Sequence, residues 1–185
     1  MAELLVTYLE MTAPPSGPSL APPRHDAIIA RERLDPENYL RLYRAVGQPW
    51  QWDQRTTMLP ESLRALLKKS STHIYVLRLS GEPAGLCEFE HVGEPEVELT
   101  NFGLVPPAQG IRLGPFLLDH ALRKIWPCGT RRIWLHTDTN DHPKAIATYE
   151  RAGFRIFQSR MESFADEPPE DRDETLQAPR SRVVD

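Results

Sequence analysis

Residues 96–164 constrain the fold of this chain most strongly, because strand and helix patterns alternate along them. The expected elements follow in the order strand, helix, strand, helix, strand, at residues 96–105, 115–126, 132–136, 143–152 and 155–164. Pro106 ends the first of these strands, and Gly153 closes the second helix. A strand followed by a helix and a further strand typically forms a parallel pair within one sheet. We therefore predict parallel pairing in the second half of the chain.

The first half of the chain predicts antiparallel pairing, because the turn at residues 80–83 joins two of its strands as a hairpin. The expected elements there are strands at 27–33, 73–79 and 84–91 and helices at 36–46 and 60–70. Asp35 followed by Pro36 is a good start for the first of these helices, because Asp caps free amides and Pro suits the first turn. Together the two halves predict the α/β class, with a mixed sheet covered by helices.

The prolines of the chain are unevenly distributed, and they suggest its organisation. A cluster between Pro14 and Pro23 separates a short apolar strand from everything after it. We interpret this cluster as an extended surface linker. From about Asp166 onward the chain has little to bury, which is typical of disorder. The predicted organisation is an extra N-terminal strand (1–12), a proline-rich linker (13–25), one α/β domain (26–165) and a disordered tail (166–185).

Composition and charge argue against several classes of partner. The formal net charge of −4 and the pI of about 5.9 do not favour nucleic acid. No run approaches the roughly 18–20 apolar residues of a membrane-spanning helix. The first residues lack the features of a signal peptide, so we expect a cytoplasmic protein. Cys87 and Cys128 form no Cys-x-x-Cys pair, His136 and His142 have no metal-ligand spacing, and we predict no metal site.

A glycine-bearing loop joins the strand at 96–105 to the helix that follows. Its residues are Gln109, Gly110, Ile111, Arg112, Leu113 and Gly114. Where a strand, such a loop and a helix N-terminus follow one another, several backbone N–H groups converge and the helix dipole adds partial positive charge. A pyrophosphate would suit this position. An ordinary turn before a helix is the alternative, because glycine is common there.

A second motif favours the interpretation of this loop as an anion site over an ordinary turn. Tyr149 precedes Gly153 and Phe154 in a Tyr-x-x-x-Gly-Phe pattern. With Gln109 and Gly114 matching a Gln/Arg-x-x-Gly-x-Gly/Ala loop, the chain resembles the GNAT superfamily of acyl-CoA-dependent N-acyltransferases over residues 27–162.

The chain departs from the superfamily pattern at two positions. Arg112 replaces the middle glycine of the loop, and its guanidinium could pair with a phosphate. The asparagine that often precedes the last helix is His142 here, with Asn140 two residues earlier. We expect Asn140 and His142 to border the cofactor.

The resemblance implies a GNAT-like fold with a V-shaped gap between the strands at 96–105 and 132–136. It also implies acetyl-CoA as co-substrate, with the pantetheine arm in this gap beside the backbone of Leu104 and Val105. A backbone N–H there would polarise the acyl carbonyl. No Cys or Ser has a visible activating partner, so we expect direct attack by an amine rather than a covalent acyl-enzyme.

Direct attack requires a general base and a general acid. The resemblance makes Tyr149 the candidate acid, with packing against the sheet as the alternative. Glu98 is the candidate base, and Glu96, Glu88 and Glu90 are further candidates on the same or the preceding strand. A solvated strand edge is the alternative for these carboxylates.

Trp50 and Trp52 follow the first helix, where acceptor pockets are usually built in this superfamily. They could line a pocket for an apolar or cationic amine, or cap the core. We predict transfer of an acetyl group to the primary amine of a small molecule. The sequence leaves open whether the protein forms a homodimer. A protein N-terminus or lysine is the alternative acceptor. A sensor that binds acyl-CoA without transfer is the alternative to an enzyme.

Overall fold

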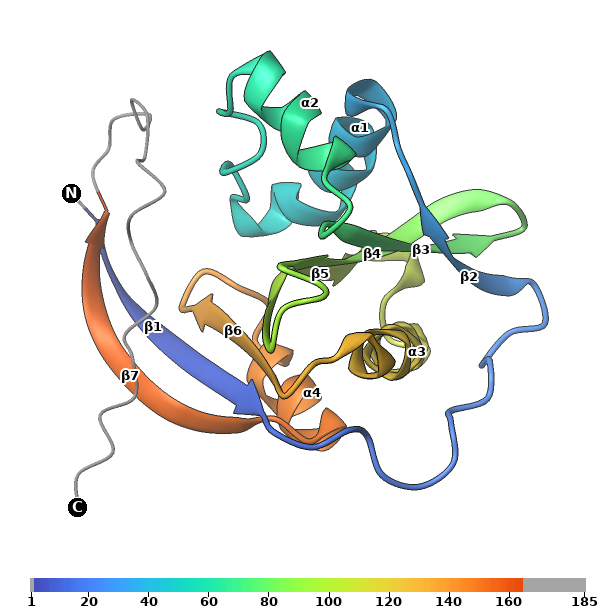
Figure 1. Ribbon diagram of the computed structural model, residues 1–185. Coiled ribbons are helices and arrows are strands. Elements are labelled where there is room, and N and C mark those ends of the chain that lie inside the picture. Colours follow the sequence, from blue (N-terminus) through green and yellow to red (C-terminus); the bar gives the residue numbers. More distant parts are fainter. Residues whose placement is uncertain (1, 165–185) are drawn as a thin grey trace.

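In the computed structural model, which describes residues 2–164, a seven-stranded mixed sheet carries helices on both faces (Figure 1). The strands are β1 (Ala2–Met11), β2 (Ala27–Glu32), β3 (His73–Leu79), β4 (Glu82–Glu90), β5 (Glu96–Leu104), β6 (Arg132–Asp138) and β7 (Arg155–Phe164). The helices are α1 (Pro36–Gly47), α2 (Pro60–Lys68), α3 (Leu113–Ile125) and α4 (Ala145–Ala152), with short 3-10 turns at Gln48–Trp50, Pro106–Ala108 and Trp126–Cys128. The predicted α/β class and mixed sheet are confirmed.

The order of strands across the sheet is β2-β3-β4-β5-β6-β1-β7. β5 and β6 form the parallel pair, and the other neighbours pair antiparallel. The strand–helix–strand pattern of the second half predicts two parallel pairs, and one of them is formed, by β5 and β6, which α3 joins as a crossover. β6 and β7, which α4 joins, do not pair, because β1 lies between them and pairs antiparallel with both.

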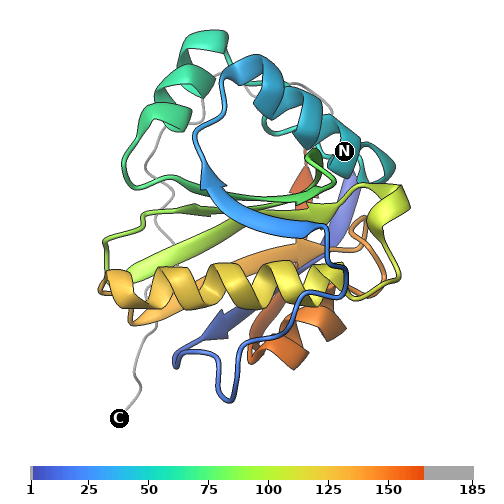
Figure 2. The same ribbon diagram turned by 90° about the vertical axis from the view of Figure 1, so that its right-hand side faces the viewer.

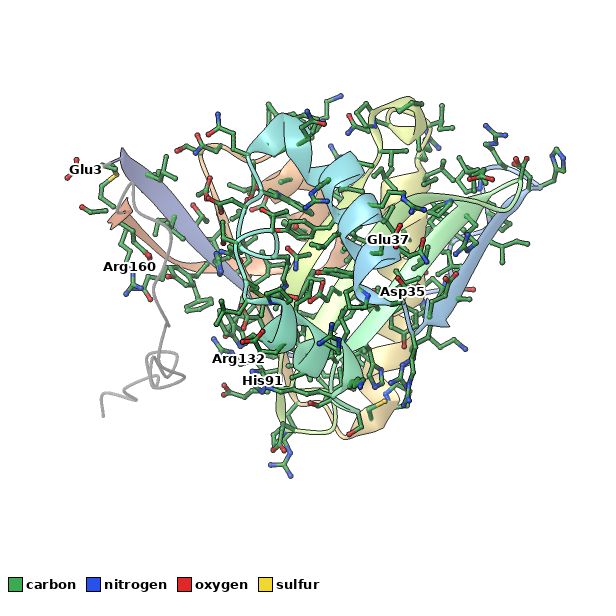
Figure 3. All side chains as sticks on the ribbon, turned by 90° about the horizontal axis from the view of Figure 1, so that it is seen from above. Glu3, Asp35, Glu37, His91, Arg132 and Arg160 are labelled. Atoms are coloured by element: carbon green, nitrogen blue, oxygen red, sulfur yellow. The ribbon has the colours of Figure 1, made fainter. Side chains whose placement is uncertain are left out.

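α1 and α2 cover one face of the sheet. Asp35 caps α1 by accepting a hydrogen bond from the amide of Asn38 at 2.9 Å, and Asp35 and Glu37 mark the exposed start of this helix (Figure 3). The buried side of α1 carries Tyr39 and Tyr43, which pack with apolar side chains of α2, β3 and β4. We call this face of the sheet the α1 face.

α3 and α4 cover the opposite face, here called the α3 face. The buried side chains of α3 pack with those of β4, β5, β6 and β1, including Leu9 and Leu135, which are 0% and 1% exposed. Full burial of one such leucine contributes about 1.5–3 kcal/mol relative to exposure. This cluster fixes the positions of the strands that surround the parallel pair.

β1 lies inside the sheet although it begins the chain. It pairs antiparallel with β6 on one side and with β7 on the other, so that Leu9 lies opposite both Leu135 and Ile156. β1 and β7 curve away from the remaining strands (Figure 1). Among the described strands, β7 joins the sheet through β1 alone.

The proline-rich residues after β1 pass along the outer side of α3 toward β2 (Figure 2). The Leu20 amide donates to the Asp119 carboxylate at 3.0 Å, and Arg123 donates to the carbonyls of Ser16 and Pro18 at 3.3 Å. An extended, proline-stiffened segment suits this path, because β1 and β2 lie far apart in the strand order. The predicted tail at 166–185 lies outside the described residues. Within residues 2–164, no helix is long and apolar enough to cross a membrane.

Candidate active site

β5 and β6 separate soon after they begin to pair. Their parallel register covers three positions: Glu96 with Arg132, Val97 with Ile133 and Glu98 with Trp134. Both strands then continue, to Leu104 and Asp138, without pairing further. The expected V-shaped gap between these strands is confirmed, and we call the unpaired stretch the strand gap.

A β-bulge in β5 explains the separation. Glu88 of β4 lies opposite Asn101, whereas the next residue, Phe89, lies opposite Leu99, so Thr100 is an extra residue in β5. Such an insertion bends the strand that carries it and increases its twist. The bulge follows directly after Glu98, the last residue of β5 that pairs with β6.

The backbone of β5 directs some of its N–H and C=O groups toward the strand gap. Val105 donates its amide to Ala84 of β4 at 2.9 Å. Because residues along an antiparallel strand alternately face toward and away from the neighbour, Phe102 and Leu104 direct their N–H and C=O groups away from β4, toward the gap. Of the two residues that the sequence suggests for the acyl carbonyl, Leu104 has its amide on this side, and the amide of Val105 is engaged in the sheet.

The loop at 109–114, here called the phosphate loop, directs several amides outward. Gly110 and Arg112 both adopt positive φ, of 84° and 65°, and α3 begins at Leu113. Within the described part of the chain, no hydrogen bond engages the amides of residues 110–114. The side chain of Gln109 holds the loop to the end of β5 by donating to the Leu104 carbonyl at 3.2 Å. These amides and the start of α3 form a favourable position for an anion.

Arg112 takes the backbone conformation that glycine favours at the middle of this loop. Its side chain is exposed. The next glycine position, Gly114, has room around it, because a Cβ there would lie 3.7 Å from the side chains of Leu104 and Phe102, an ordinary contact. Neither the substitution at Arg112 nor the packing at Gly114 blocks the loop amides.

Glu98 lies on the α1 face beside the strand gap, because Val97 and Leu99 on either side of it pack on the α3 face. Its side chain is 20% exposed. Burial, and then the nearby Glu90, raise the pKa of Glu98 to about 7, although Arg55 opposes this. A carboxylate with this pKa can both take up and release a proton near neutral pH.

The other candidate carboxylates have partners. Glu88 is fully buried, and it accepts hydrogen bonds from Tyr39 at 2.5 Å and Arg55 at 2.8 Å. Arg55 also binds Glu90 at 2.5 Å. The carboxylate of Glu96 is 58% exposed and lies 3.4 Å from Arg132. Within the described residues, Glu98 is therefore the buried candidate whose carboxylate no arginine contacts directly.

His136 is a site residue that the sequence analysis did not identify. Its Nε2 atom lies 3.9 Å from Glu98 Oε1, and its ring lies 5.9 Å from that of Tyr8 and 6.4 Å from that of Trp134. Burial lowers its pKa, against the opposing effect of Asp141 and two other carboxylates, so the ring is neutral near pH 7. Strand alternation could have identified this residue, because His136 lies two residues after Trp134 and so shares its face, and Trp134 pairs with Glu98.

Tyr149 lies on the α3 face. Its ring centroid is 5.8 Å from that of Phe102 and 5.9 Å from that of Phe154, and the residue is 8% exposed. Burial, with smaller effects of Asp141 and Cys87, raises the pKa of Tyr149 well above its usual range. The phenol is therefore protonated at neutral pH. Its hydroxyl makes no hydrogen bond within residues 2–164, so it can donate to an incoming group.

Trp50 and Trp52 lie next to the β6–α4 loop, residues 139–144. Trp52 donates from Nε1 to Asp141 at 3.2 Å, and its ring packs at 5.4 Å from Tyr43. The ring of Trp50 meets that of His142 edge-on at 4.9 Å. Both tryptophans therefore join the segment after α1 to the loop before α4.

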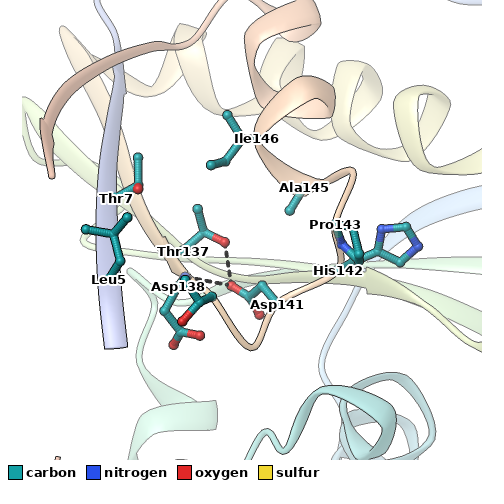
Figure 4. A pocket seen from close by; sticks show the side chains of 10 residues that line it. Leu5, Thr7, Thr137, Asp138, Asp141, His142, Pro143, Ala145 and Ile146 are labelled. Carbon is teal, nitrogen blue, oxygen red and sulfur yellow. Dashed lines mark hydrogen bonds between the residues drawn. The ribbon is translucent and has the colours of Figure 1, made fainter. Parts of the chain in front are cut away.

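A cavity of about 200 Å³ lies between β1, the end of β6 and the start of α4 (Figure 4). Leu5 and Thr7 of β1 border one side, with Asp138 beside them, and Ala145 and Ile146 of α4 border the other, while the His142 ring points away from the β1 side chains. Asn140 is exposed, and its amide donates to Asp138 at 2.7 Å. Across residues 2–164, no group of three or more His, Cys, Asp or Glu side chains is placed to hold a metal ion.

Comparison with known proteins agrees with this geometry. The model of the acetyltransferase (GNAT) family matches residues 39–154, well over half of the chain. The chain belongs to the GNAT acetyltransferase family. This membership identifies it as an acyltransferase, and GNAT proteins generally use acyl-CoA. A sequence search of curated proteins gave no match.

Solved structures share the GNAT fold with this chain. A putative acetyltransferase of Novosphingobium aromaticivorans is 20% identical with a TM-score of 0.59, over 87% of this chain and 63% of that one. An aminoglycoside acetyltransferase from a soil metagenome is 16% identical with a TM-score of 0.58, over 82% and 97%. The ribosomal-protein-S18-alanine N-acetyltransferase of Escherichia coli is 20% identical with a TM-score of 0.56, over 69% and 76%. At these identities the likeness concerns the fold, and the chain spans less than two thirds of the Novosphingobium protein.

Proposed function

We propose that this GNAT protein transfers the acetyl group of acetyl-CoA to the primary amine of a small molecule by direct attack in a ternary complex. The observation that carries the proposal is the placement of Glu98 and Tyr149 on opposite faces of the sheet, beside the same strand gap. An amine arriving from the α1 face would meet the base. A thioester held on the α3 face would have its sulfur beside the acid.

The groups that would hold acetyl-CoA are mainly backbone amides. The amides of residues 110–114, at the start of α3, suit the pyrophosphate, and Arg112 adds an exposed positive charge. In the strand gap, the Leu104 amide suits the acyl oxygen. Asn140 and His142 stand beside α4, where they would border the cofactor. These groups fit the charge pattern of acyl-CoA, which is anionic at one end and carries an amide-rich arm.

The chemical step divides between the two faces. The acceptor nitrogen attacks the carbonyl carbon, and the Leu104 amide stabilises the oxygen as it gains negative charge. Glu98 removes a proton from the nitrogen, directly or through a water. Tyr149 donates its phenolic proton to the sulfur as the carbon–sulfur bond breaks. The products are the N-acetylated amine and CoA as a free thiol, and Tyr149 regains its proton from solvent.

His136 would carry the proton from Glu98 to solvent. The distance of 3.9 Å between the two side chains is too long for a direct hydrogen bond but fits a bridging water or a small rotation. The imidazole is neutral near pH 7, and its side chain is 41% exposed. A base that is largely buried needs such an outlet to return to the carboxylate form in each turnover.

The segment that carries Trp50 and Trp52 supports a small acceptor over a polypeptide. It is fastened to the β6–α4 loop, so it crosses from the α1 side toward α4 and restricts the space beside the gap. Acceptors of both classes occur among proteins with this fold, since one similar structure is an aminoglycoside acetyltransferase and another acts on a ribosomal-protein alanine.

A thiol-release assay tests the proposal. Purified protein is incubated with acetyl-CoA and a panel of small primary amines, and free CoA and acetylated product are measured together. The proposal expects amine-dependent release of CoA with one product per thiol. Binding of acetyl-CoA without release for any amine would instead support the sensor, and release with peptides alone would support a protein acetyltransferase.

A further inference from the structure

One carboxylate connects the β6–α4 loop to both β6 and the segment after α1. Asp141 Oδ2 accepts hydrogen bonds from the Thr137 hydroxyl at 2.5 Å and the Asp138 amide at 3.3 Å (Figure 4). Its other oxygen, Oδ1, accepts from Trp52 Nε1 at 3.2 Å. The same side chain therefore fixes the start of its own loop and holds an indole that is 89 residues away in sequence.

The neighbouring residue makes a second contact of the same kind. His142 accepts a hydrogen bond on Nδ1 from the Lys144 amide at 3.0 Å, which fixes its ring at the start of α4. The ring of Trp50 lies edge-on against it. Two consecutive residues before α4 thus hold two tryptophans that are one residue apart.

The position of Trp52 is shaped for an indole. A Cβ added at Gly47 would lie 2.5 Å from Trp52 Cβ, so this glycine leaves space for Trp52. A Cβ added at Gly103 would lie 2.5 Å from Val46 of α1 but 3.4 Å from the Trp52 ring, an ordinary contact, so the ring packs beside Gly103 in the stretch of β5 that borders the strand gap. The indole therefore rests against the acceptor side of the gap while its N–H reaches the loop that leads to Tyr149.

We propose that Asp141 is a positioning residue that couples acetyl-CoA binding to the acceptor side. The inference rests on the proposed function. Acetyl-CoA that contacts the β6–α4 loop stabilises the position of this loop, and Asp141 then holds Trp52 and its segment in place beside the gap. The acceptor pocket is thereby completed when the donor is bound.

Coupling of this kind is reciprocal. If bound acetyl-CoA favours the arrangement in which Asp141 holds Trp52, then loss of the tie must weaken acetyl-CoA binding by the same factor. The tie is a hydrogen bond to a charged acceptor between two partly buried groups. Such bonds have a net effect that corresponds to about a ten- to hundredfold change in an equilibrium constant, which is the upper limit for this coupling.

The test measures the dissociation constant of acetyl-CoA by calorimetry, without any acceptor. Trp52→Phe removes the N–H donor and keeps an aromatic ring between the glycines, and Asp141→Asn removes one of the two accepting oxygens. We expect each variant to bind acetyl-CoA about three- to tenfold more weakly, and the double variant to be no weaker than the weaker single variant. The wild-type tryptophan fluorescence should change on saturation with acetyl-CoA, and this change should be smaller in Asp141→Asn.

Trp126→Phe provides a matched control. Its Nε1 atom is buried without a hydrogen-bond partner in the described residues, so the same substitution removes an N–H that ties nothing. We expect its affinity for acetyl-CoA to equal that of the wild type. Circular dichroism and melting temperature report on folding of every variant.

The outcomes separate the coupling from the proposed function. Wild-type protein that binds acetyl-CoA, with Trp52→Phe and Asp141→Asn folded and of unchanged affinity, would overturn the coupling and leave the proposed function standing. If both variants melt earlier but retain wild-type affinity and fluorescence response, the tie is structural only and the coupling is wrong. Wild-type protein that fails to bind acetyl-CoA would overturn the proposed function, and the coupling with it.

Discussion

The carboxylate of Glu98 lies 3.9 Å from the imidazole of His136, on the α1 face and at the position where β5 and β6 stop pairing. Burial raises the pKa of Glu98 to about 7 and lowers the pKa of His136. The carboxylate can therefore take up and release a proton near neutral pH, and the more exposed imidazole is the titratable side chain beside it.

The first prediction concerns the pH dependence of acetyl transfer. Glu98 acts as a base only when it is deprotonated, and its pKa is raised, so kcat/KM should rise as pH increases through about 7. Glu98→Gln should lower the rate about 10²–10⁴-fold and remove this rise. The measurement is the pH–rate profile of the wild type and the variant.

Glu96→Gln is the control for this profile, because Glu96 shares the α1 face but is exposed and beside Arg132. We expect it to leave the profile unchanged. If Glu98→Gln retains the rise near pH 7, another group is the base.

The second prediction separates charge from packing at Gly114. A Cβ at this position meets only ordinary contacts, so Gly114→Ala should fold and bind acetyl-CoA. Gly114→Asp places a carboxylate in the first turn of α3, which suits the helix dipole but opposes a pyrophosphate. We expect its ligand-free melting temperature to be preserved, while acetyl-CoA no longer raises it.

The scale of this effect is set by mass action. Acetyl-CoA at 100 times its dissociation constant should stabilise the wild type by about 2.7 kcal/mol. An equal shift in Gly114→Asp would place the pyrophosphate elsewhere.

The third prediction concerns Arg112, whose φ of 65° is unfavourable for a side chain with a Cβ. Arg112→Gly should remove a strain of about 1–2 kcal/mol and so raise the free energy of unfolding. If the guanidinium pairs with a phosphate, the same variant should bind acetyl-CoA more weakly, and more so at low salt. Urea unfolding and calorimetry measure the two effects on one protein. Tighter binding by Arg112→Gly would show that Arg112 is only tolerated.

The elements could be predicted from the sequence because they depend on local patterns, and the proposed cofactor side of the site rests on patterns of the same kind. The strand, loop and helix around Gly114 are contiguous, and Tyr149 belongs to a short motif with Gly153. Asp35 and Pro36 marked the start of α1 for the same reason, since a helix cap is formed within one turn.

Contacts between segments that are distant in the sequence could not be predicted from local patterns. Nothing in the local pattern of β1 indicates that it pairs between β6 and β7, because a strand's partners depend on the whole sheet. His136 was missed because its role depends on Glu98, which belongs to another strand. The sequence suggests that Trp52 lines a pocket or caps the core. Its hydrogen bond to Asp141 joins residues that are 89 positions apart, so no local pattern indicates it.

The fourth prediction follows from the inner position of β1. Leu9 and Leu5 lie on the same face of this strand, but Leu9 is fully buried and Leu5 is 41% exposed. Leu9→Ala should lower the free energy of unfolding by about 2–5 kcal/mol, because it leaves a cavity beneath α4. Leu5→Ala should change it far less. Urea denaturation of both variants checks this, and equal effects would argue against β1 as an inner strand.

The turnover of Tyr149→Phe decides whether Tyr149 is the general acid. This substitution removes only the hydroxyl and keeps the ring between Phe102 and Phe154, so the fold should be preserved. With the amine identified by thiol release, we predict that kcat falls at least about tenfold while both Michaelis constants change little, because the hydroxyl acts mainly in the transition state. A folded Tyr149→Phe protein with near wild-type kcat would contradict the account and return Tyr149 to a packing role.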